Sequence, residues 1–153
     1  MELKMEINLT LPRQRITGET IFREVSLPST ATRYSVGHDF FAPKPVVFPP
    51  NSTTKVHTGV KLRMPKHLWM ELHIRSSLAV LGLSVKGGVI DPDYCGEIGV
   101  VVRNDSSKPV DIEAGQRFCQ GVLHPAIRAD IIRADTMAPS SERGESGFGS
   151  TGK

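Results

Sequence analysis

The chain has 153 residues, of which 39% are hydrophobic and 23% charged, as in an ordinary globular domain with a real core. Its 19 basic and 16 acidic residues give a formal net charge of +3, a balance that argues against binding of duplex nucleic acid and suits a small anion. No apolar run approaches the roughly 18 residues that span a membrane, and the first residues lack a signal peptide's apolar core. We therefore expect an intracellular protein, cytoplasmic or nuclear, with no membrane and no nucleic-acid partner; its two cysteines fit a reducing compartment.

The first part of the chain predicts short strands separated by loops. Residues 3–9 alternate between apolar and polar types, which is typical of a strand. Residues 35–42 predict a buried strand with one acid, Asp39, which is either a plain structural residue or braces an arginine. Four prolines exclude a helix through residues 43–50. Alternation returns at residues 54–64 and predicts another strand.

One short helix is predicted at residues 75–82. Ser76 or Ser77 can cap its start, and Gly82 can end it. The sequence Arg75-Ser76-Ser77 at a helix N-terminus also combines a cation, two hydroxyls and free backbone amides, which suits a bound phosphate. The sequence alone does not separate the capping role from the phosphate-binding role.

The stretch 87–97 predicts two strands around a tight turn, a hairpin with two carboxylates and one aromatic residue at its bend. Gly87 and Gly88 leave backbone groups open to a ligand because no side chain covers them. A calcium loop is excluded, because Cys95 is a poor ligand and Val102 stands where a bidentate glutamate is needed. A purely structural hairpin and a catalytic carboxylate beside a nucleotide both remain open.

Further strands are predicted at residues 69–74, 110–112 and 118–123. Many short strands, joined by Pro- and Gly-containing turns, indicate an all-β sandwich or jelly roll. His57 and the other histidines lack zinc spacing and matching thiolates, so they are interpreted as surface or core residues.

The C-terminal stretch 143–153 is rich in Gly, Ser and Thr, a composition typical of a flexible tail. Residues 147–153 also fit the spacing of a P-loop, but no strand precedes them, so that match is discarded. Phe148 can stack on a base and Arg143 can grip a phosphate with its planar fork. The tail is therefore either a plain disordered end or a lid that orders over a nucleotide.

Five short motifs together are specific enough to indicate one protein family. The sequence resembles the trimeric deoxyuridine triphosphatases (dUTPases), with all five family motifs in order. The matching segments are residues 37–42, 75–79, 88–96, 115–120 and 143–152. His38 stands where the family usually has an aromatic residue, and Cys95 where a polar or basic residue is common. The resemblance implies a single-domain, jelly-roll-like β-barrel over residues 1–138 with one short helix, followed by a flexible Gly-rich arm, residues 139–153, that closes over the active site.

The resemblance also implies roles for individual residues. Asp91 would be the general base for the attacking water, Tyr94 would stack beneath the deoxyribose and exclude a 2′-hydroxyl, and Asp39 would give structural support. Backbone groups would pair with uracil, while cations and hydroxyls would hold the phosphates. The remaining implied substrate contacts are Arg75, Ser76, Ser77, Gly87, Gly88, Val89, Ile90, Gly99, Gln120, Arg143, Phe148, Gly149, Ser150 and Thr151.

The implied activity is the hydrolysis of dUTP to dUMP and pyrophosphate by attack on the α-phosphorus. Such an enzyme keeps uracil out of DNA and supplies dUMP for dTMP synthesis. Mg²⁺ is the implied cofactor, held chiefly by substrate phosphates and waters rather than by protein ligands. The implied assembly is a homotrimer with active sites between subunits.

Two alternatives belong to other functional classes. A dCTP deaminase shares the fold and the Arg-Ser-Ser-Leu-Ala stretch, but it needs a glutamate where Val101 stands here. A non-catalytic regulatory protein on a dUTPase scaffold is the second alternative. The intact Asp91, Tyr94 and Arg143 argue for catalysis, although they leave a second role open.

Overall fold

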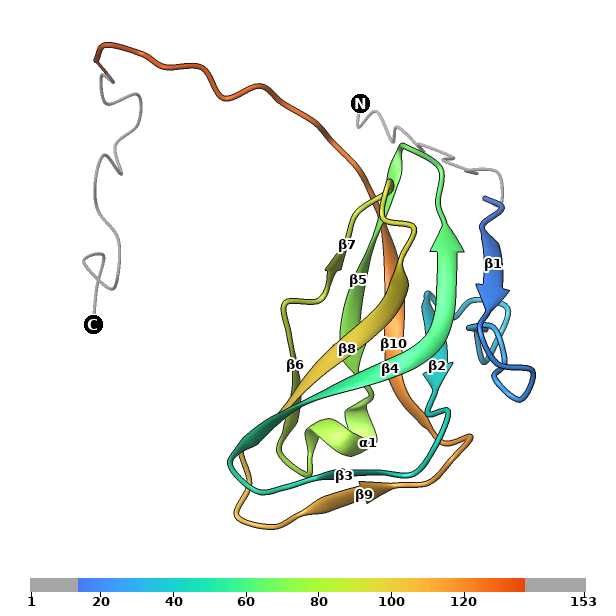
Figure 1. Cartoon of the computed structure of the whole chain (residues 1–153). Coiled ribbons are helices and arrows are strands. Elements are labelled where there is room, and N and C mark those ends of the chain that lie inside the picture. Colours follow the sequence, from blue (N-terminus) through green and yellow to red (C-terminus); the bar gives the residue numbers. More distant parts are fainter. Residues whose placement is uncertain (1–13, 137–153) are drawn as a thin grey trace, which may run out of the picture.

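Strands dominate the part of the chain that the structure describes, residues 14–136 of the computed structural model (Figure 1). This part contains ten strands and one four-residue helix. In chain order the elements are β1 (Thr17–Thr20), β2 (Gly37–Phe41), β3 (Val46–Phe48), β4 (Ser52–Arg63), β5 (Leu68–Ile74), α1 (Ser76–Ala79), β6 (Leu83–Lys86), β7 (Val89–Ile90), β8 (Glu97–Asn104), β9 (Val110–Ile112) and β10 (Arg117–Pro125).

Two four-stranded antiparallel sheets form the body of the molecule. One sheet has the order β1-β4-β8-β6 and the other the order β2-β10-β5-β7, while β3 and β9 form a two-stranded ribbon. The all-β, jelly-roll-like fold predicted from the sequence is confirmed. The barrel is not closed in the described residues, because β6 pairs only with β8 and β7 only with β5, so each sheet keeps its own edges.

The core lies between the two large sheets. Alternate residues of β8 point inward, and Ile98, Val100 and Val102 are each no more than 1% exposed. Met70 of β5 and Phe118 of β10 belong to the same apolar cluster and are equally buried. The apolar residues at alternate positions of β8 thus form one face that packs into the core.

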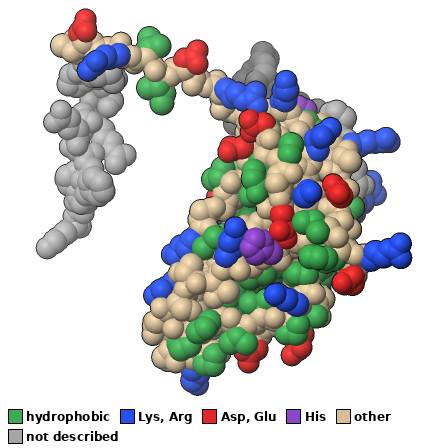
Figure 2. Space-filling view, in the orientation of Figure 1, with side chains coloured by type: hydrophobic (Ala, Val, Ile, Leu, Met, Phe, Trp, Pro, Cys, Tyr) green, Lys and Arg blue, Asp and Glu red, His purple; other side chains and the backbone are tan. Residues whose placement is uncertain are grey.

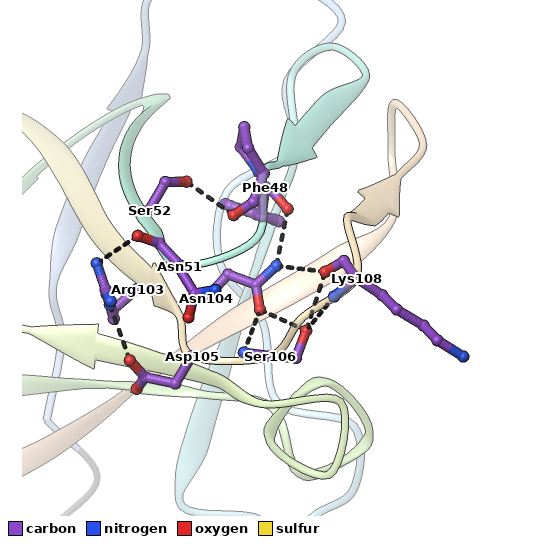
Figure 3. Close-up of polar contacts among 9 residues, drawn as sticks. Phe48, Asn51, Ser52, Arg103, Asn104, Asp105, Ser106 and Lys108 are labelled. Atoms are coloured by element: carbon purple, nitrogen blue, oxygen red, sulfur yellow. Dashed lines mark hydrogen bonds and ion pairs between the residues drawn. The ribbon is translucent and has the colours of Figure 1, made fainter.

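A buried polar side chain fastens the ribbon to this core (Figure 3). Asn104, the last residue of β8, donates through Nδ2 to the carbonyl oxygens of Phe48 (2.9 Å) and Lys108 (2.8 Å). Its Oδ1 accepts hydrogen bonds from the backbone N–H (2.9 Å) and hydroxyl (2.8 Å) of Ser106. Every donor and acceptor of the buried amide is therefore used, and β8 is tied both to β3 and to the turn before β9.

The hairpin predicted around residues 91–96 is wrong. Strand β7 pairs with β5, whereas β8 pairs with β4 and β6, so the turn connects the two sheets instead of joining two paired strands. Glycines allow this crossing. Gly87 turns the chain with a φ of 65° after β6, and a Cβ on Gly88 would lie 2.7 Å from the carbonyl oxygen of Leu72 on β5.

Most of the other predicted strands are present in the structure. Strands β2, β4, β5, β9 and β10 lie where the sequence predicted strands, and no helix interrupts residues 43–50. The sequence did not predict β1, β3 or β6, none of which is longer than four residues. The strand predicted at residues 3–9 and the tail from residue 143 lie outside the described residues. Within the described part, no helix is both long and apolar enough to cross a membrane.

Candidate functional site

A buried carboxylate holds two arginines where β5 ends. The Asp39 side chain on β2 is only 8% exposed; its Oδ1 lies 3.2 Å from Nε of Arg75 and its Oδ2 lies 3.3 Å from Nη1 of Arg117. The two arginine side chains are 31% and 45% exposed, so part of each guanidinium stays open to solvent. Gln120 of β10 lies opposite Asp39 in the strand register. We call these four residues the arginine cluster.

Strand pairing brings the cluster together from distant parts of the sequence. Strand β10 lies between β2 and β5, and the backbone N–H of Arg75 donates to the carbonyl oxygen of Phe118 at 3.1 Å. The register between β2 and β10 shifts between Arg117 and Cys119. Arg117 was missing from the residues proposed from sequence, although it lies inside the fourth motif quoted above.

The serines after Arg75 do not cap the helix, so the structure excludes one of the two roles that the sequence left open for them. Arg75 itself occupies the N-cap position with an extended backbone and no side-chain cap bond. Ser76 and Ser77 are exposed, and neither hydroxyl bonds to another residue of the described chain. Both hydroxyls are therefore free to contact a ligand beside the arginine cluster. The turn that follows α1 ends at Gly82, whose φ is 93°.

The turn after β7, residues 91–96, presents an exposed carboxylate and a partly exposed aromatic ring. The backbone N–H of Tyr94 donates to the carbonyl oxygen of Asp91 (3.1 Å), and the Tyr94 hydroxyl donates to the carbonyl oxygen of Glu97 (2.8 Å). A Cβ on Gly96 would lie 2.6 Å from that hydroxyl, so the ring requires glycine there. The Asp91 side chain is exposed and forms no hydrogen bond or ion pair with another side chain in residues 14–136.

A groove of about 520 Å³ lies between β5, β6 and the segment that joins β6 to β7. Gly87, Gly88 and Val89 line it, so three of the residues predicted to contact a base share one surface. Ile90 continues β7 beyond the groove, opposite Met70. Gly99 lies on β8, with the Lys55 side chain against it.

The structure does not bring Asp91 and the arginine cluster together within one chain. Ile90 lies opposite Met70, so Asp91 follows at the start of β5, whereas Arg75 comes directly after its end. The six residue-to-residue steps from Trp69 to Arg75 span roughly 20 Å at about 3.3 Å per step. Figure 1 shows the same separation, with the end of β7 pointing away from α1. One phosphorus atom cannot contact both parts of a single copy.

Protein metal ligands are not clustered in this region. No group of three or more His, Cys, Asp or Glu side chains in residues 14–136 is arranged to hold a metal ion. The tail residues predicted to contact substrate, Arg143, Phe148, Gly149, Ser150 and Thr151, lie outside the described residues.

The fold is shared with solved dUTPases. The dUTPase of Staphylococcus bacteriophage 80alpha with dUpNHpp matches with a TM-score of 0.82 at 23% identity, covering 91% of this chain and 99% of that one. A mutant dUTPase from phage phi11 of S. aureus, described as coordinating a structural Mg(II) ion, matches with a TM-score of 0.74 at 17% identity, covering 80% and 98%. These likenesses establish the class of fold.

Sequence comparison establishes the family. The dUTPase family model matches residues 23–152. A deoxyuridine 5'-triphosphate nucleotidohydrolase from Anaeromyxobacter sp. is 39% identical over 132 residues, which cover 84% of this chain and 89% of the relative. The chain therefore belongs to the dUTPase family, a family of hydrolases in nucleotide metabolism, as its five motifs predicted.

Proposed function

We propose that the protein hydrolyses dUTP to dUMP and pyrophosphate by attack of water on the α-phosphorus. The observation that carries the proposal is the exposed Asp91 carboxylate on the turn closed by Tyr94. No described side chain forms a hydrogen bond or ion pair with this carboxylate. The turn follows directly on the glycine-lined groove, so a base in that groove would lie near the carboxylate. Family membership supports the same reaction.

The main catalytic task is to neutralise the negative charge of the triphosphate. A bound nucleoside triphosphate brings about four negative charges, which repel an incoming hydroxide. Arg75 and Arg117 are held by Asp39 before substrate arrives, so little reorganisation is needed when they bind phosphate. The free hydroxyls of Ser76 and Ser77 add hydrogen bonds beside them.

Asp91 is proposed to orient one water molecule and accept its proton. A carboxylate suffices for this role when the water is well positioned, because effective concentration then supplies much of the rate. The proton moves from the water oxygen to the Asp91 carboxylate as the new oxygen–phosphorus bond forms. Pyrophosphate is the leaving group.

Base and sugar are proposed to be selected by the groove and the turn. Backbone groups of Gly87 and Gly88 would pair with the uracil edge and would reject cytosine, whose donor and acceptor are reversed. Tyr94, 44% exposed, would lie beneath the deoxyribose and leave no room for a 2′-hydroxyl. Val89, 60% exposed, would add apolar contact beside them.

The donor set of the described residues fits a Mg²⁺ ion held mainly by triphosphate oxygens and water. Mg²⁺ favours such ligands and needs no dedicated protein cage, and no carboxylate cluster is formed in residues 14–136. When bound, the ion would reduce the negative charge on the phosphates. Arg75, Ser76 and Gln120 would then orient the same phosphates from the protein side.

The complete site is proposed to form between copies of the chain in a homotrimer. The separation of roughly 20 Å along β5 means that Asp91 of one subunit must meet the arginine cluster of another. We propose that residues 1–138 form the domain and residues 139–153 the arm. Arg143, Phe148, Gly149, Ser150 and Thr151 of the arm would then close over base and triphosphate.

The test is a single substitution with a matched control on the same turn. In Asp91→Asn we expect kcat for dUTP to fall about 10²- to 10⁴-fold, because only the base is removed, while affinity for dUpNHpp stays within about threefold of wild type. Asp93→Asn should retain activity. Pyrophosphate release and calorimetric binding provide the two readings; an unchanged kcat in Asp91→Asn, or ammonia release from dCTP, would contradict the proposal.

A further inference from the structure

At the start of β8 the regular ladder with β4 is interrupted, and side chains bridge the interruption: the Thr58 hydroxyl donates to the carbonyl oxygen of Ile98 at 2.8 Å, and Glu97 makes further contacts. The register between these strands shifts between His57 and Lys61, and Gly59 in the shifted stretch has a φ of 72°. Such a bulge leaves backbone groups outside the ladder. Glu97, the first residue of β8, fills this gap: its Oε1 accepts the Gly59 N–H at 2.8 Å, and its Oε2 lies 3.1 Å from Nδ1 of His57.

The carboxylate of Glu97 is held in its charged form. Partial burial acts to raise the pKa of Glu97, but the Gly59 N–H, the His57 ring and the charges of His57 and Lys55 act in the opposite direction and lower it from its ordinary value of 4.5. The Gly59 N–H and the His57 ring thus both stabilise the charged carboxylate. They fix the peptide group at the start of β8 relative to the bulge.

The same residue bonds to the proposed site through its backbone. The carbonyl oxygen of Glu97 accepts the Tyr94 hydroxyl at 2.8 Å, and the Tyr94 N–H in turn closes the turn at Asp91. A continuous set of contacts therefore leads from the Gly59 bulge through Glu97 and Tyr94 to Asp91.

We propose that Glu97 is a positioning residue for sugar selection: its carboxylate, fixed on the β4 bulge, orients the carbonyl that holds the Tyr94 ring against the deoxyribose. This inference rests on the proposed function, because it assigns a task to Tyr94 in the same site. Glu97 itself touches no reacting atom.

Discrimination between dUTP and UTP separates positioning from general stability. Loss of folded protein lowers kcat/KM for both nucleotides equally, whereas a displaced Tyr94 ring opens room for the 2′-hydroxyl and lowers the ratio of the two values. In Glu97→Ala we expect the dUTP-to-UTP ratio of kcat/KM to fall about tenfold. Tyr94→Phe removes the same hydrogen bond from the other side and should lower the ratio similarly.

Two further variants complete the experiment. Glu97→Gln keeps an acceptor for the Gly59 N–H and should restore the ratio to within about threefold of wild type. Glu113→Ala removes an exposed glutamate from a distant turn and should leave the ratio unchanged. If Glu97→Ala does not fold, an unchanged ratio in Tyr94→Phe still overturns the proposal, because the hydrogen bond through which Glu97 acts would then play no part in sugar selection.

The result that would overturn the role of Glu97 differs from the result that would overturn the proposed function. If the wild-type protein does not hydrolyse dUTP, the proposed function fails. If wild type hydrolyses dUTP and either Glu97→Ala or Tyr94→Phe keeps the wild-type ratio, the positioning role of Glu97 is overturned.

Discussion

Asp39 shows how one buried side chain can prepare a binding site before any ligand arrives. Its two oxygens pair with Arg75 and Arg117, which come from two other parts of the chain. Each arginine keeps an exposed portion, so the carboxylate restricts the cations without consuming them. The arrangement combines structural support with readiness to bind phosphate.

Asp39→Asn should lower both stability and substrate binding. The amide leaves two arginines without a full counter-charge; because solvent screens their exposed parts, we expect a loss of about 2 kcal/mol in the free energy of unfolding. KM for dUTP should rise, since the guanidinium groups are no longer held in place. Urea unfolding and steady-state kinetics measure the two effects.

Asp105→Asn is the matched control for this prediction. Asp105 also pairs with an arginine, Arg103, at 2.8 Å, but its side chain is 59% exposed. A surface pair of this kind contributes at most about 1 kcal/mol. Equal losses in the two variants would contradict the role assigned to the burial of Asp39.

Individual residues were predictable from the sequence where local chemistry decides their environment. The sequence offered bracing of an arginine as one role for Asp39, but it could not identify Arg117, because only the register of β10 brings that residue within reach. The capping role, one of the two that the sequence left open for Ser76 and Ser77, is absent for a related reason. Arg75 takes the N-cap position of α1 and its side chain is drawn to Asp39, so a tertiary contact overrides a local preference.

At the scale of elements, the buried Asn104 fastens β8 to β3 and to the 105–109 turn. Asn104→Asp should destabilise the fold by about 3 kcal/mol, because a carboxylate oxygen would face the carbonyl oxygens of Phe48 and Lys108 and a charge would be buried. Burial raises the pKa of such an introduced acid, so the folded variant binds a proton more readily than the unfolded chain. The variant should therefore regain part of its stability as pH falls.

Chemical unfolding at two pH values tests this prediction, with Ser52→Ala as control. The Ser52 hydroxyl makes one exposed hydrogen bond, to the carbonyl oxygen of Pro49 at 2.7 Å, so its loss should cost less than about 1 kcal/mol at either pH. A pH-independent loss in Asn104→Asp would show that the buried amide is not the decisive feature.

Strands were predictable because alternation is local, whereas their partners were not. The pattern at residues 87–102 correctly indicated two strands, yet β7 pairs with β5 and β8 with β4 and β6. Nothing in the alternation distinguishes a hairpin from a crossing between sheets. The close approach of Gly88 to Leu72 decides the outcome, and that contact joins strands that are distant in sequence.

At the scale of the whole molecule, the chain leaves apolar side chains without cover. After β10 the chain runs away from the body, and green apolar side chains stand out on this segment in Figure 2. Ile127 is 92% exposed, Ile131 101% and Ile132 83%. Exposed apolar side chains like these mark surfaces that contact another molecule, and we propose a second copy of this chain as that molecule. The proposed division of the site between copies requires the same kind of assembly.

Mixing two inactive variants tests that division. Arg75→Ala removes one half of the proposed site and Asp91→Asn the other, so each variant alone should be inactive. When the variants are co-refolded in equal amounts, a site that takes Arg75 from one subunit and Asp91 from another is intact in about one case in four, so about a quarter of wild-type activity should return. Each variant refolded with itself is the control, and light scattering should give the mass of three chains. If the mixture stays inactive while forming trimers, both groups must act from the same chain, and the separation along β5 would have to close by a rearrangement that the folded domain does not display.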